Sequence, residues 1–136
     1  MPLSAITKIV QNLGSAKGFV KVCQGAVITK ATPEMFQISL KVTQDKCNMM
    51  NTLHGGFIAT LVDVIPTLDL MRLGYPPGVS VDLSVQYMNV ACLDSTILCE
   101  SRLLKVGKKM AFCELDIIDE ATKSLLARGK HTKYLT

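Results

Sequence analysis

Aromatic residues are scarce in this sequence. It contains no tryptophan, and phenylalanine, tyrosine and tryptophan together make up only 5% of the chain. Proteins that bind nucleic acids commonly stack bases on aromatic side chains within a strongly basic groove. Here the lysines and arginines are dispersed, and the net charge is only +4. We therefore expect no nucleic-acid partner, although the mild positive charge suits an anionic small molecule.

Long hydrophobic runs are also absent. Lysine, aspartate or arginine interrupts every apolar stretch before it reaches the roughly 18 residues that a membrane-spanning helix requires. We therefore expect no membrane span. The residues before Glu34, the first acidic residue, carry only basic charges, but they lack the arginines of a strong transit peptide and the apolar core of a secretory signal. The expected location is the cytoplasm, with the mitochondrion as the alternative.

Residues that bind metals or form disulfides are few and scattered. The five cysteines are Cys23, Cys47, Cys92, Cys99 and Cys113. Their number is odd, and no Cys-x-x-Cys spacing occurs among them. The two histidines, His54 and His131, also lack ligand spacing. We expect reduced cysteines and no metal site.

The length of the chain fits a single domain. Its 136 residues, 49% of them hydrophobic, are enough to bury roughly two-thirds of the unfolded surface. Hydrophobic spacing predicts an α+β domain with the order α-β-β-α-β-β-β-β. The predicted helices span residues 4–13 and 53–73, and the predicted strands span residues 19–29, 36–42, 79–87, 96–105, 110–118 and 125–134. Because the second helix is apolar nearly all round, an antiparallel sheet curled around it would bury it.

Two groups of apolar side chains are expected to be buried. The strand predicted at residues 79–87 alternates strictly, which indicates one buried face and one free face that carries Ser80. Five of the seven methionines are expected to fill the core or to line a tunnel. They are Met49, Met50, Met71, Met88 and Met110.

The most informative segment runs from Asn48 to Asp63. His54, Gly55 and Gly56 stand where the second helix begins, and unpaired backbone N–H groups at such an end can stabilise a developing oxyanion. Asp63 follows within the apolar helix, where burial is expected to raise its basicity. The segment therefore predicts an oxyanion donor and a general base.

The spacing within this segment predicts a shared site. Asp63 lies eight residues after Gly55, which corresponds to roughly 12 Å along a helix axis. One substrate carbonyl cannot contact both groups of the same helix. A two-fold dimer would solve this problem, because its antiparallel helices bring Gly55 of one subunit towards Asp63 of the other.

Together with residues 77–83 and 129–133, this segment resembles the hotdog-fold acyl-CoA thioesterases, and the similarity extends over residues 30–135. The resemblance implies a hotdog fold and hydrolysis of fatty acyl-CoA, with medium to long chains as the expected substrates. It also implies that no metal or cofactor is needed, and that the protein forms a homodimer that assembles into a homotetramer.

The resemblance also implies roles for individual residues. Asp63 matches the general base or nucleophile, and Ser80 matches the residue that holds the attacking water. Gly55 matches the backbone N–H donor to the thioester carbonyl. Asn48 and His54 match the side chains that position this carbonyl. The residues alone leave open whether Asp63 activates water or forms an acyl-enzyme.

A predicted hairpin is the candidate grip for the CoA phosphates. It presents three lysines around Gly107, which permits close approach of the backbone. The resemblance adds further contacts to the substrate. The complete predicted set is Tyr87, Met88, Asn89, Val90, Ala91, Cys92, Lys105, Val106, Gly107, Lys108, Lys109, Met110 and Tyr134. His131 and Lys133 are expected to add positive charge nearby.

Three positions depart from the family pattern. Asn51 replaces a usual glycine, Pro66 replaces a serine within the helix, and Asp69 replaces a small residue. A proline at position 66 has no N–H for the Val62 carbonyl and is expected to kink the helix. Asp69 places a second carboxylate in a buried helix.

Two other functions compete with thioester hydrolysis. An acyl-CoA hydratase or dehydratase of the same fold would pair its carboxylate with a histidine a few residues later, and no histidine follows Asp63 before His131. A regulatory module that binds acyl-CoA and engages a lipid-transfer protein would keep the lysines but would not need Asp63.

Overall fold

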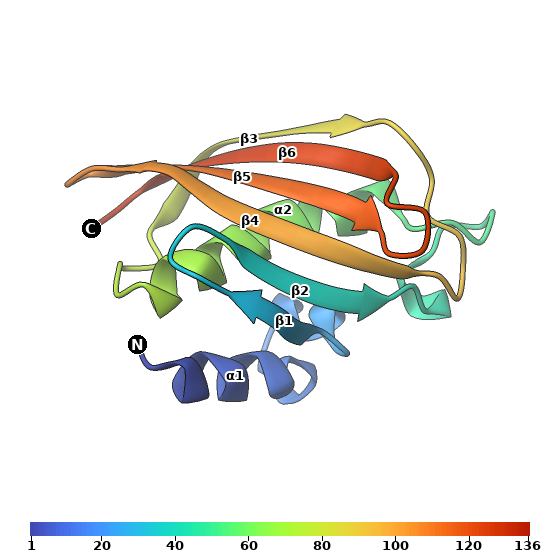
Figure 1. Cartoon of the computed structure of the whole chain (residues 1–136), viewed down its shortest axis with the longest axis horizontal. Helices are drawn as coiled ribbons and strands as arrows, with labels where there is room; N and C mark the ends of the chain where they lie inside the picture. Colours follow the sequence, from blue (N-terminus) through green and yellow to red (C-terminus); the bar gives the residue numbers. More distant parts are fainter.

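The protein, described here from a computed structural model of residues 1–136, is a six-stranded antiparallel sheet curled around one long helix (Figure 1). The strand order in the sheet is β1-β2-β4-β5-β6-β3. The helices are α1 (Leu3–Gln11) and α2 (Gly55–Arg72), with short 3-10 helices η1 (Leu13–Ser15), η2 (Phe19–Cys23) and η3 (Gln44–Lys46). The strands are β1 (Val27–Ala31), β2 (Phe36–Lys41), β3 (Val79–Tyr87), β4 (Thr96–Val106), β5 (Met110–Asp119) and β6 (Leu125–Tyr134). The predicted α+β class is confirmed.

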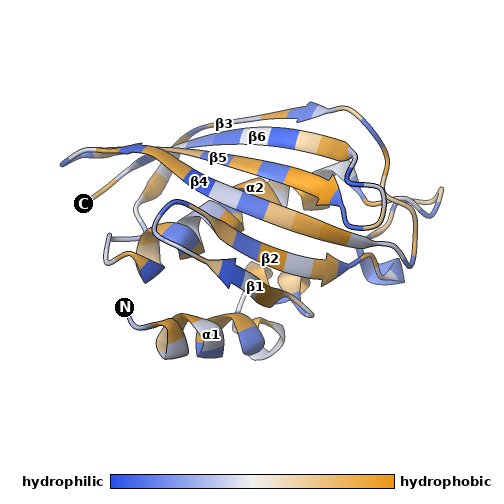
Figure 2. Ribbon diagram, viewed as in Figure 1, coloured by the Kyte–Doolittle hydropathy of each residue, from blue (hydrophilic) through white to orange (hydrophobic).

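The core lies between α2 and the sheet. Hydrophobic and hydrophilic residues alternate along the central strands (Figure 2), and β2, β4 and β5 present apolar side chains to the core. Phe36, Ile38 and Leu40 of β2 are almost completely buried on this face. α1 covers β1 and contributes Ile6 and Val10 to the same core. None of the helices combines the length and the apolar character that crossing a bilayer requires.

The first predicted strand is wrong over its first half. Residues 19–23 form η2, and β1 begins only at Val27. Gly18 and Gly25 flank this segment with φ values of 90° and 97°, in a left-handed region that breaks an extended strand. The segment was predicted as a strand because it is rich in β-forming residues, and this composition gives no sign of the left-handed glycines at its two ends.

The predicted burial of β3 and of three methionines is also wrong. β3 is an edge strand, and Val79 and Val81 are 61% and 59% exposed because no further strand or helix covers them. Met49 and Met50, in the loop before α2, are almost fully exposed, and Met88, directly after β3, is 45% exposed, so none of the three is part of a core. These apolar side chains have no cover within one subunit.

α2 packs tightly against the sheet at Gly129 of β6. A Cβ atom added at Gly129 would lie 2.5 Å from Cγ1 of Val62 and closer still to Cγ2. Val62 is branched at Cβ and fully buried, so it has little freedom to move away. Gly129 therefore sets how closely α2 approaches β6.

We expect Gly129→Ala to lower the free energy of unfolding by about 1–3 kcal/mol, because the added methyl group overpacks the contact with Val62. Urea unfolding at a fixed protein concentration measures this change. Gly107→Ala is the matched control, since its Cβ would meet nothing closer than 3.6 Å. Equal stability of the two variants would contradict the assignment of Gly129 as the limiting contact.

Candidate active site

The start of α2 leaves backbone donors free, among them the Gly55 N–H. His54 is the N-cap residue, and its Nδ1 accepts a hydrogen bond of 2.8 Å from the Gly56 N–H. The Gly55 N–H has no hydrogen-bond partner in the protein. His54 therefore acts as a helix cap, and Gly55 presents the free donor that an oxyanion requires.

Asn48 shapes the loop in front of this helix. Its Oδ1 accepts hydrogen bonds from the Met50 and Thr52 N–H groups at 2.9 and 3.2 Å, and its Nδ2 donates to Thr52 Oγ1 at 2.8 Å. Asn51 follows with φ 59°, a conformation that asparagine tolerates better than most residues. The structure thus explains the asparagine at position 51 and shows Asn48 bonded within the loop, with one amide hydrogen left for a ligand.

Hollows beside the start of α2 provide room for a substrate. One, of about 320 Å³, has apolar walls from Phe19, Val22 and Phe57 and is also lined by His54 and Gly56. A second, of about 460 Å³, shares His54 and reaches Asn48 and Met49. Both hollows lie at the helix end that carries the free Gly55 N–H.

Asp63 is less buried than its apolar surroundings in the sequence suggested. Its side chain is 53% exposed, because it lies on a polar stripe of α2 that the sheet does not cover. The stripe consists of Gly56, Thr60, Asp63 and Thr67. The two threonine hydroxyls donate to the carbonyls of Gly56 and Asp63, at 2.9 and 2.8 Å. Within one subunit the carboxylate is open to a ligand.

A β-bulge turns Ser80 towards α2. Ser80 pairs with Lys133 of β6, but Asp82 pairs with Thr132, so Val81 is an extra residue in β3. Beyond the bulge, Leu83 pairs with His131, which faces α2 as Lys133 does. The prediction that Ser80 lies on the face away from the core is therefore wrong, since the bulge reverses the alternation.

His131 joins Ser80 and Asp63 in one cluster. Its Nε2 lies 2.7 Å from Ser80 Oγ and 4.0 Å from Asp63 Oδ1. Because the same nitrogen faces both groups, the three residues are not a catalytic triad, in which the two ring nitrogens serve different partners. His131 is 1% exposed and therefore lies beneath the reacting surface.

Burial and the charge of Lys133 both favour the neutral form of the His131 ring. Burial lowers the pKa of His131, the nearby Lys133 lowers it further, and Asp63 opposes both effects. Burial also lowers the pKa of Lys133, again opposed by Asp63. The Lys133 ammonium group donates to Thr67 Oγ1. These two residues were predicted to lie near the CoA phosphates, but the structure places them beneath Asp63.

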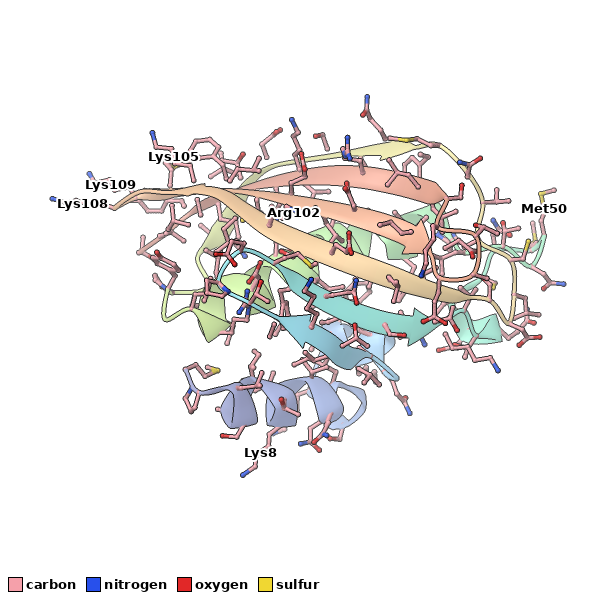
Figure 3. The ribbon with its side chains drawn as sticks, viewed as in Figure 1. Lys8, Met50, Arg102, Lys105, Lys108 and Lys109 are labelled. Atoms are coloured by element: carbon pink, nitrogen blue, oxygen red, sulfur yellow. The ribbon has the colours of Figure 1, made fainter.

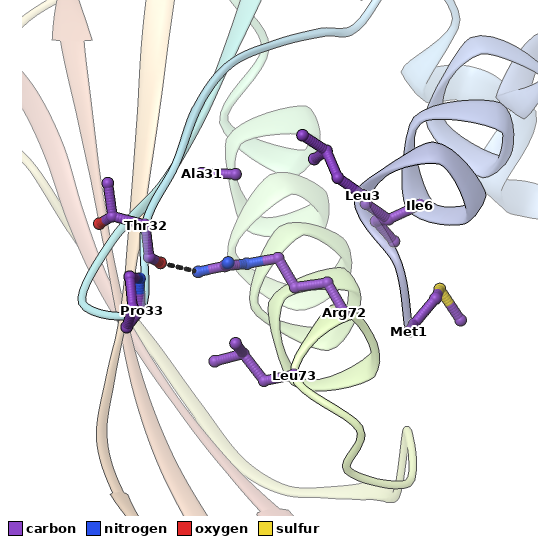
Figure 4. Close-up of a pocket in the computed structure, with 8 residues that line it drawn as sticks. All are labelled: Met1, Leu3, Ile6, Ala31, Thr32, Pro33, Arg72 and Leu73. Atoms are coloured by element: carbon purple, nitrogen blue, oxygen red, sulfur yellow. Dashed lines mark hydrogen bonds between the residues drawn. The ribbon is translucent and has the colours of Figure 1, made fainter.

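Asp69 is a structural carboxylate. It is 1% exposed, and its oxygens accept hydrogen bonds from Arg72 Nε at 2.7 Å and Ser101 Oγ at 2.8 Å. Burial raises the pKa of Asp69, while Ser101 and Arg72 oppose this shift. Arg72 also donates to the Thr32 carbonyl beside a cavity of about 250 Å³ under α1 (Figure 4). This cavity contains none of the predicted site residues.

The predicted CoA contacts fall into two groups at opposite ends of the subunit. The segment 87–92 lies beside the start of α2, where Tyr87 Oη donates to the Gly55 carbonyl and the Ala91 carbonyl accepts from the Leu53 N–H. Lys105, Lys108 and Lys109 project from the far tip of the β4–β5 hairpin, opposite Met50 (Figure 3). Tyr134 pairs with Met110 near this tip. One subunit does not bring the two groups together.

Metal ligands do not gather anywhere in the chain. No group of three or more histidine, cysteine, aspartate or glutamate side chains could hold an ion. All five cysteines are free. Burial raises the pKa of the Cys23 and Cys113 thiols to about 11, so these two are uncharged fillers of the core.

Known proteins resemble this chain over almost its whole length. The model of the family described as thioesterase superfamily matches residues 50–125. Acyl-coenzyme A thioesterase 13 of Mus musculus is 37% identical over 131 residues, which cover 96% of this chain and 94% of that protein. The Homo sapiens protein of the same name is 36% identical, with the same coverage. The crystal structure of zebrafish thioesterase superfamily member 2 superposes with a TM-score of 0.93, at 36% identity, covering 100% of this chain and 99% of that chain.

Proposed function

Because this chain belongs to the thioesterase superfamily and is a thioester hydrolase, we propose that it hydrolyses fatty acyl-CoA to free fatty acid and CoA. One observation carries this proposal. The helix that presents the free Gly55 N–H also bears Asp63, a half-exposed carboxylate whose cluster includes Ser80. We expect acyl chains of medium to long length, since the hollow beside Gly56 is walled by Phe19, Val22 and Phe57.

The proposed reaction needs three groups around one thioester. The Gly55 N–H donates to the thioester carbonyl and stabilises the oxyanion that forms when water attacks. Asp63 accepts a proton from this water, and Ser80 holds the water in position. The tetrahedral intermediate then collapses, breaks the C–S bond, and releases the fatty acid and the CoA thiol, which takes up the proton. No metal or cofactor takes part in this scheme.

The exposed edge of the sheet supports a dimer. β3 leaves one row of backbone groups unpaired and exposes Val79, Val81 and Tyr87. Such an edge is ready to pair with another strand. We infer that β3 pairs with the β3 of a second copy around a two-fold axis, which continues the sheet and covers these side chains. A tetramer of two such dimers, and a lipid-transfer partner, are further expectations of this proposal.

The dimer would complete the site in two ways. Within α2, Gly55 and Asp63 are separated by about 12 Å along the axis, and antiparallel helices of two subunits remove this separation. Within one subunit the lysines at the tip of the β4–β5 hairpin (Lys105, Lys108 and Lys109) lie at the opposite end from Met50, which stands just before α2 (Figure 3). The same rotation would bring these lysines of one subunit towards the start of α2 in the other. Both the chemistry and the grip on CoA therefore support a site shared between subunits.

The distance between His131 and Asp63 favours one competing function. An acyl-CoA hydratase needs a histidine near its carboxylate, and the fold brings His131 to 4.0 Å from Asp63 although the two are far apart in sequence. However, His131 is buried and its Nε2 is engaged by Ser80. It cannot contact a substrate in this position, so thioester hydrolysis fits the geometry better.

We expect Asp63→Asn to lower kcat for a long-chain acyl-CoA by about 10²-fold or more, because the amide cannot act as a base. Release of free CoA thiol measures turnover, and calorimetry with CoA measures binding, which should persist. Asp94→Asn is the matched control, since Asp94 is a surface residue paired only with Lys41. Unchanged turnover in Asp63→Asn would refute the mechanism, and a wild-type protein that binds but hydrolyses no chain length would favour the regulatory module.

We expect a mixture of Asp63→Asn and Gly55→Pro subunits to regain activity. Proline suits the first position of a helix and removes the N–H, and the extended backbone of His54 (φ −65°, ψ 133°) tolerates a following proline. After random exchange, half of the dimers would be mixed and half of their sites intact, which gives about a quarter of the wild-type activity.

Two controls accompany this mixing experiment. Gly55→Ala keeps the N–H, and its Cβ would lie 3.5 Å from Tyr87, so it should lose far less activity than Gly55→Pro. A subunit with both Asp63→Asn and Gly55→Pro should not complement Asp63→Asn. Well-folded mixed dimers without activity would show that the site is not shared.

We expect the double variant Lys108→Gln, Lys109→Gln to raise KM for acyl-CoA by about tenfold, which corresponds to about 1.4 kcal/mol of lost phosphate binding. KM for an acyl-pantetheine thioester, which lacks the nucleotide phosphates, should not change. Lys8→Gln on α1, far from the hairpin (Figure 3), is the control. An equal effect on both substrates would exclude the hairpin as the phosphate grip.

A further inference from the structure

One buried atom of the site cluster has no partner. The Nδ1 of His131 is the single buried side-chain nitrogen or oxygen in the protein that makes no hydrogen bond in the structure. Its other ring nitrogen, Nε2, lies 2.7 Å from Ser80 Oγ. A buried polar atom without a partner is costly and therefore needs an explanation.

A backbone carbonyl of α2 also lacks its usual partner. α2 continues through Pro66, which has no N–H to donate to the Val62 carbonyl one turn earlier. The neighbouring Asp63 carbonyl, in contrast, accepts the Thr67 hydroxyl at 2.8 Å. Proline thus leaves one acceptor of the helix unused.

The fold brings these two groups to the same place. Val62 packs against Gly129, which precedes His131 by two residues on the same face of β6. The Val62 and Asp63 carbonyls are close enough to the imidazole ring to favour its protonation, although burial and Lys133 outweigh them. The charged groups that face the ring are Asp63 on α2 and Lys133 on β6.

We propose that Pro66 frees the Val62 carbonyl to accept a hydrogen bond from His131 Nδ1–H, which fixes His131 as the Nδ1–H tautomer and makes Ser80 donate its hydroxyl hydrogen to Nε2. The neutral state of the ring makes this choice of tautomer meaningful, because a doubly protonated ring would donate from both nitrogens.

The tautomer would decide how Ser80 treats the attacking water, and this consequence rests on the proposed hydrolysis. When Ser80 donates to His131, its oxygen is left as an acceptor, so the water can donate one hydrogen to Ser80 and the other to Asp63. Both lone pairs of the water are then free of hydrogen bonds, and one of them can attack the thioester carbon. In the opposite tautomer Ser80 would donate its hydroxyl hydrogen to the water, which draws electron density from the attacking oxygen and makes it a weaker nucleophile. His131 is thus a positioning residue that acts through Ser80.

The two histidines provide an internal comparison. His54 Nδ1 accepts from the Gly56 N–H, so neutral His54 must carry its proton on Nε2. We expect ¹⁵N NMR of the imidazole nitrogens at neutral pH to show opposite tautomers, with Nδ1–H at His131 and Nε2–H at His54. His131→Gln identifies the signals. An Nε2–H tautomer at His131 would overturn the proposal, whether or not the protein hydrolyses acyl-CoA.

Pro66→Ala tests the contribution of the proline. Alanine restores the N–H that bonds the Val62 carbonyl and favours the helix, so the variant should fold. We expect His131 to shift towards the Nε2–H tautomer and kcat to fall by about tenfold with little change in KM, as for a misplaced reacting group. Pro33→Ala, in the β1–β2 turn, should change neither. An unaltered tautomer in Pro66→Ala would overturn the role of the proline, and an altered tautomer with unaltered kcat would overturn the role of His131 in positioning.

Discussion

The close contact between α2 and β6 at Val62 and Gly129 is the constraint on which the site depends. A glycine at this point lets the backbone of β6 approach a branched, fully buried side chain of the helix. Asp63 is the next residue of α2, and His131 is the next residue of β6 on the helix-facing side. A shift of the helix away from the sheet would separate the carboxylate from the groups beneath it. The contact between Val62 and Gly129 therefore fixes the distance between Asp63 and His131.

The second constraint is that the groups proposed to bind the thioester and the CoA phosphates lie far apart within one subunit. The free Gly55 N–H and the segment 87–92 lie at one end of the molecule, while the lysine tip lies at the other (Figure 3). The edge strand β3 lies against the same helix and exposes apolar side chains. A two-fold axis along this edge would correct both defects at once. The proposed dimer would thus account for the exposure of Asp63 and of β3 together.

The sequence predicted the order of the elements and the long helix well, because their hydrophobic periods are unambiguous. It failed where single residues alter the backbone. The bulge at Val81 reverses the face of Ser80, and no periodicity reveals an extra residue in a strand. The burial of Asp63 was overestimated because a sequence window does not show which side of a helix stays uncovered. His131 and Lys133 were named but placed near the CoA phosphates. Their position facing α2 could have been predicted, since they follow Ala127 and Gly129 on the same face of β6.

The two histidines differ in the hydrogen bonds that the surrounding backbone offers to their rings. His54 stands at a helix start, where unpaired N–H groups are plentiful, and its ring acts as an acceptor. His131 stands beside the middle of the same helix, where carbonyls are normally all paired and a ring finds no acceptor. Pro66 changes this, because it leaves the helix continuous while releasing one carbonyl inside the protein. A proline usually weakens a helix, but here it leaves a backbone carbonyl free to accept a hydrogen bond from a side chain. In a regular helix that carbonyl would be bonded to the backbone N–H one turn later.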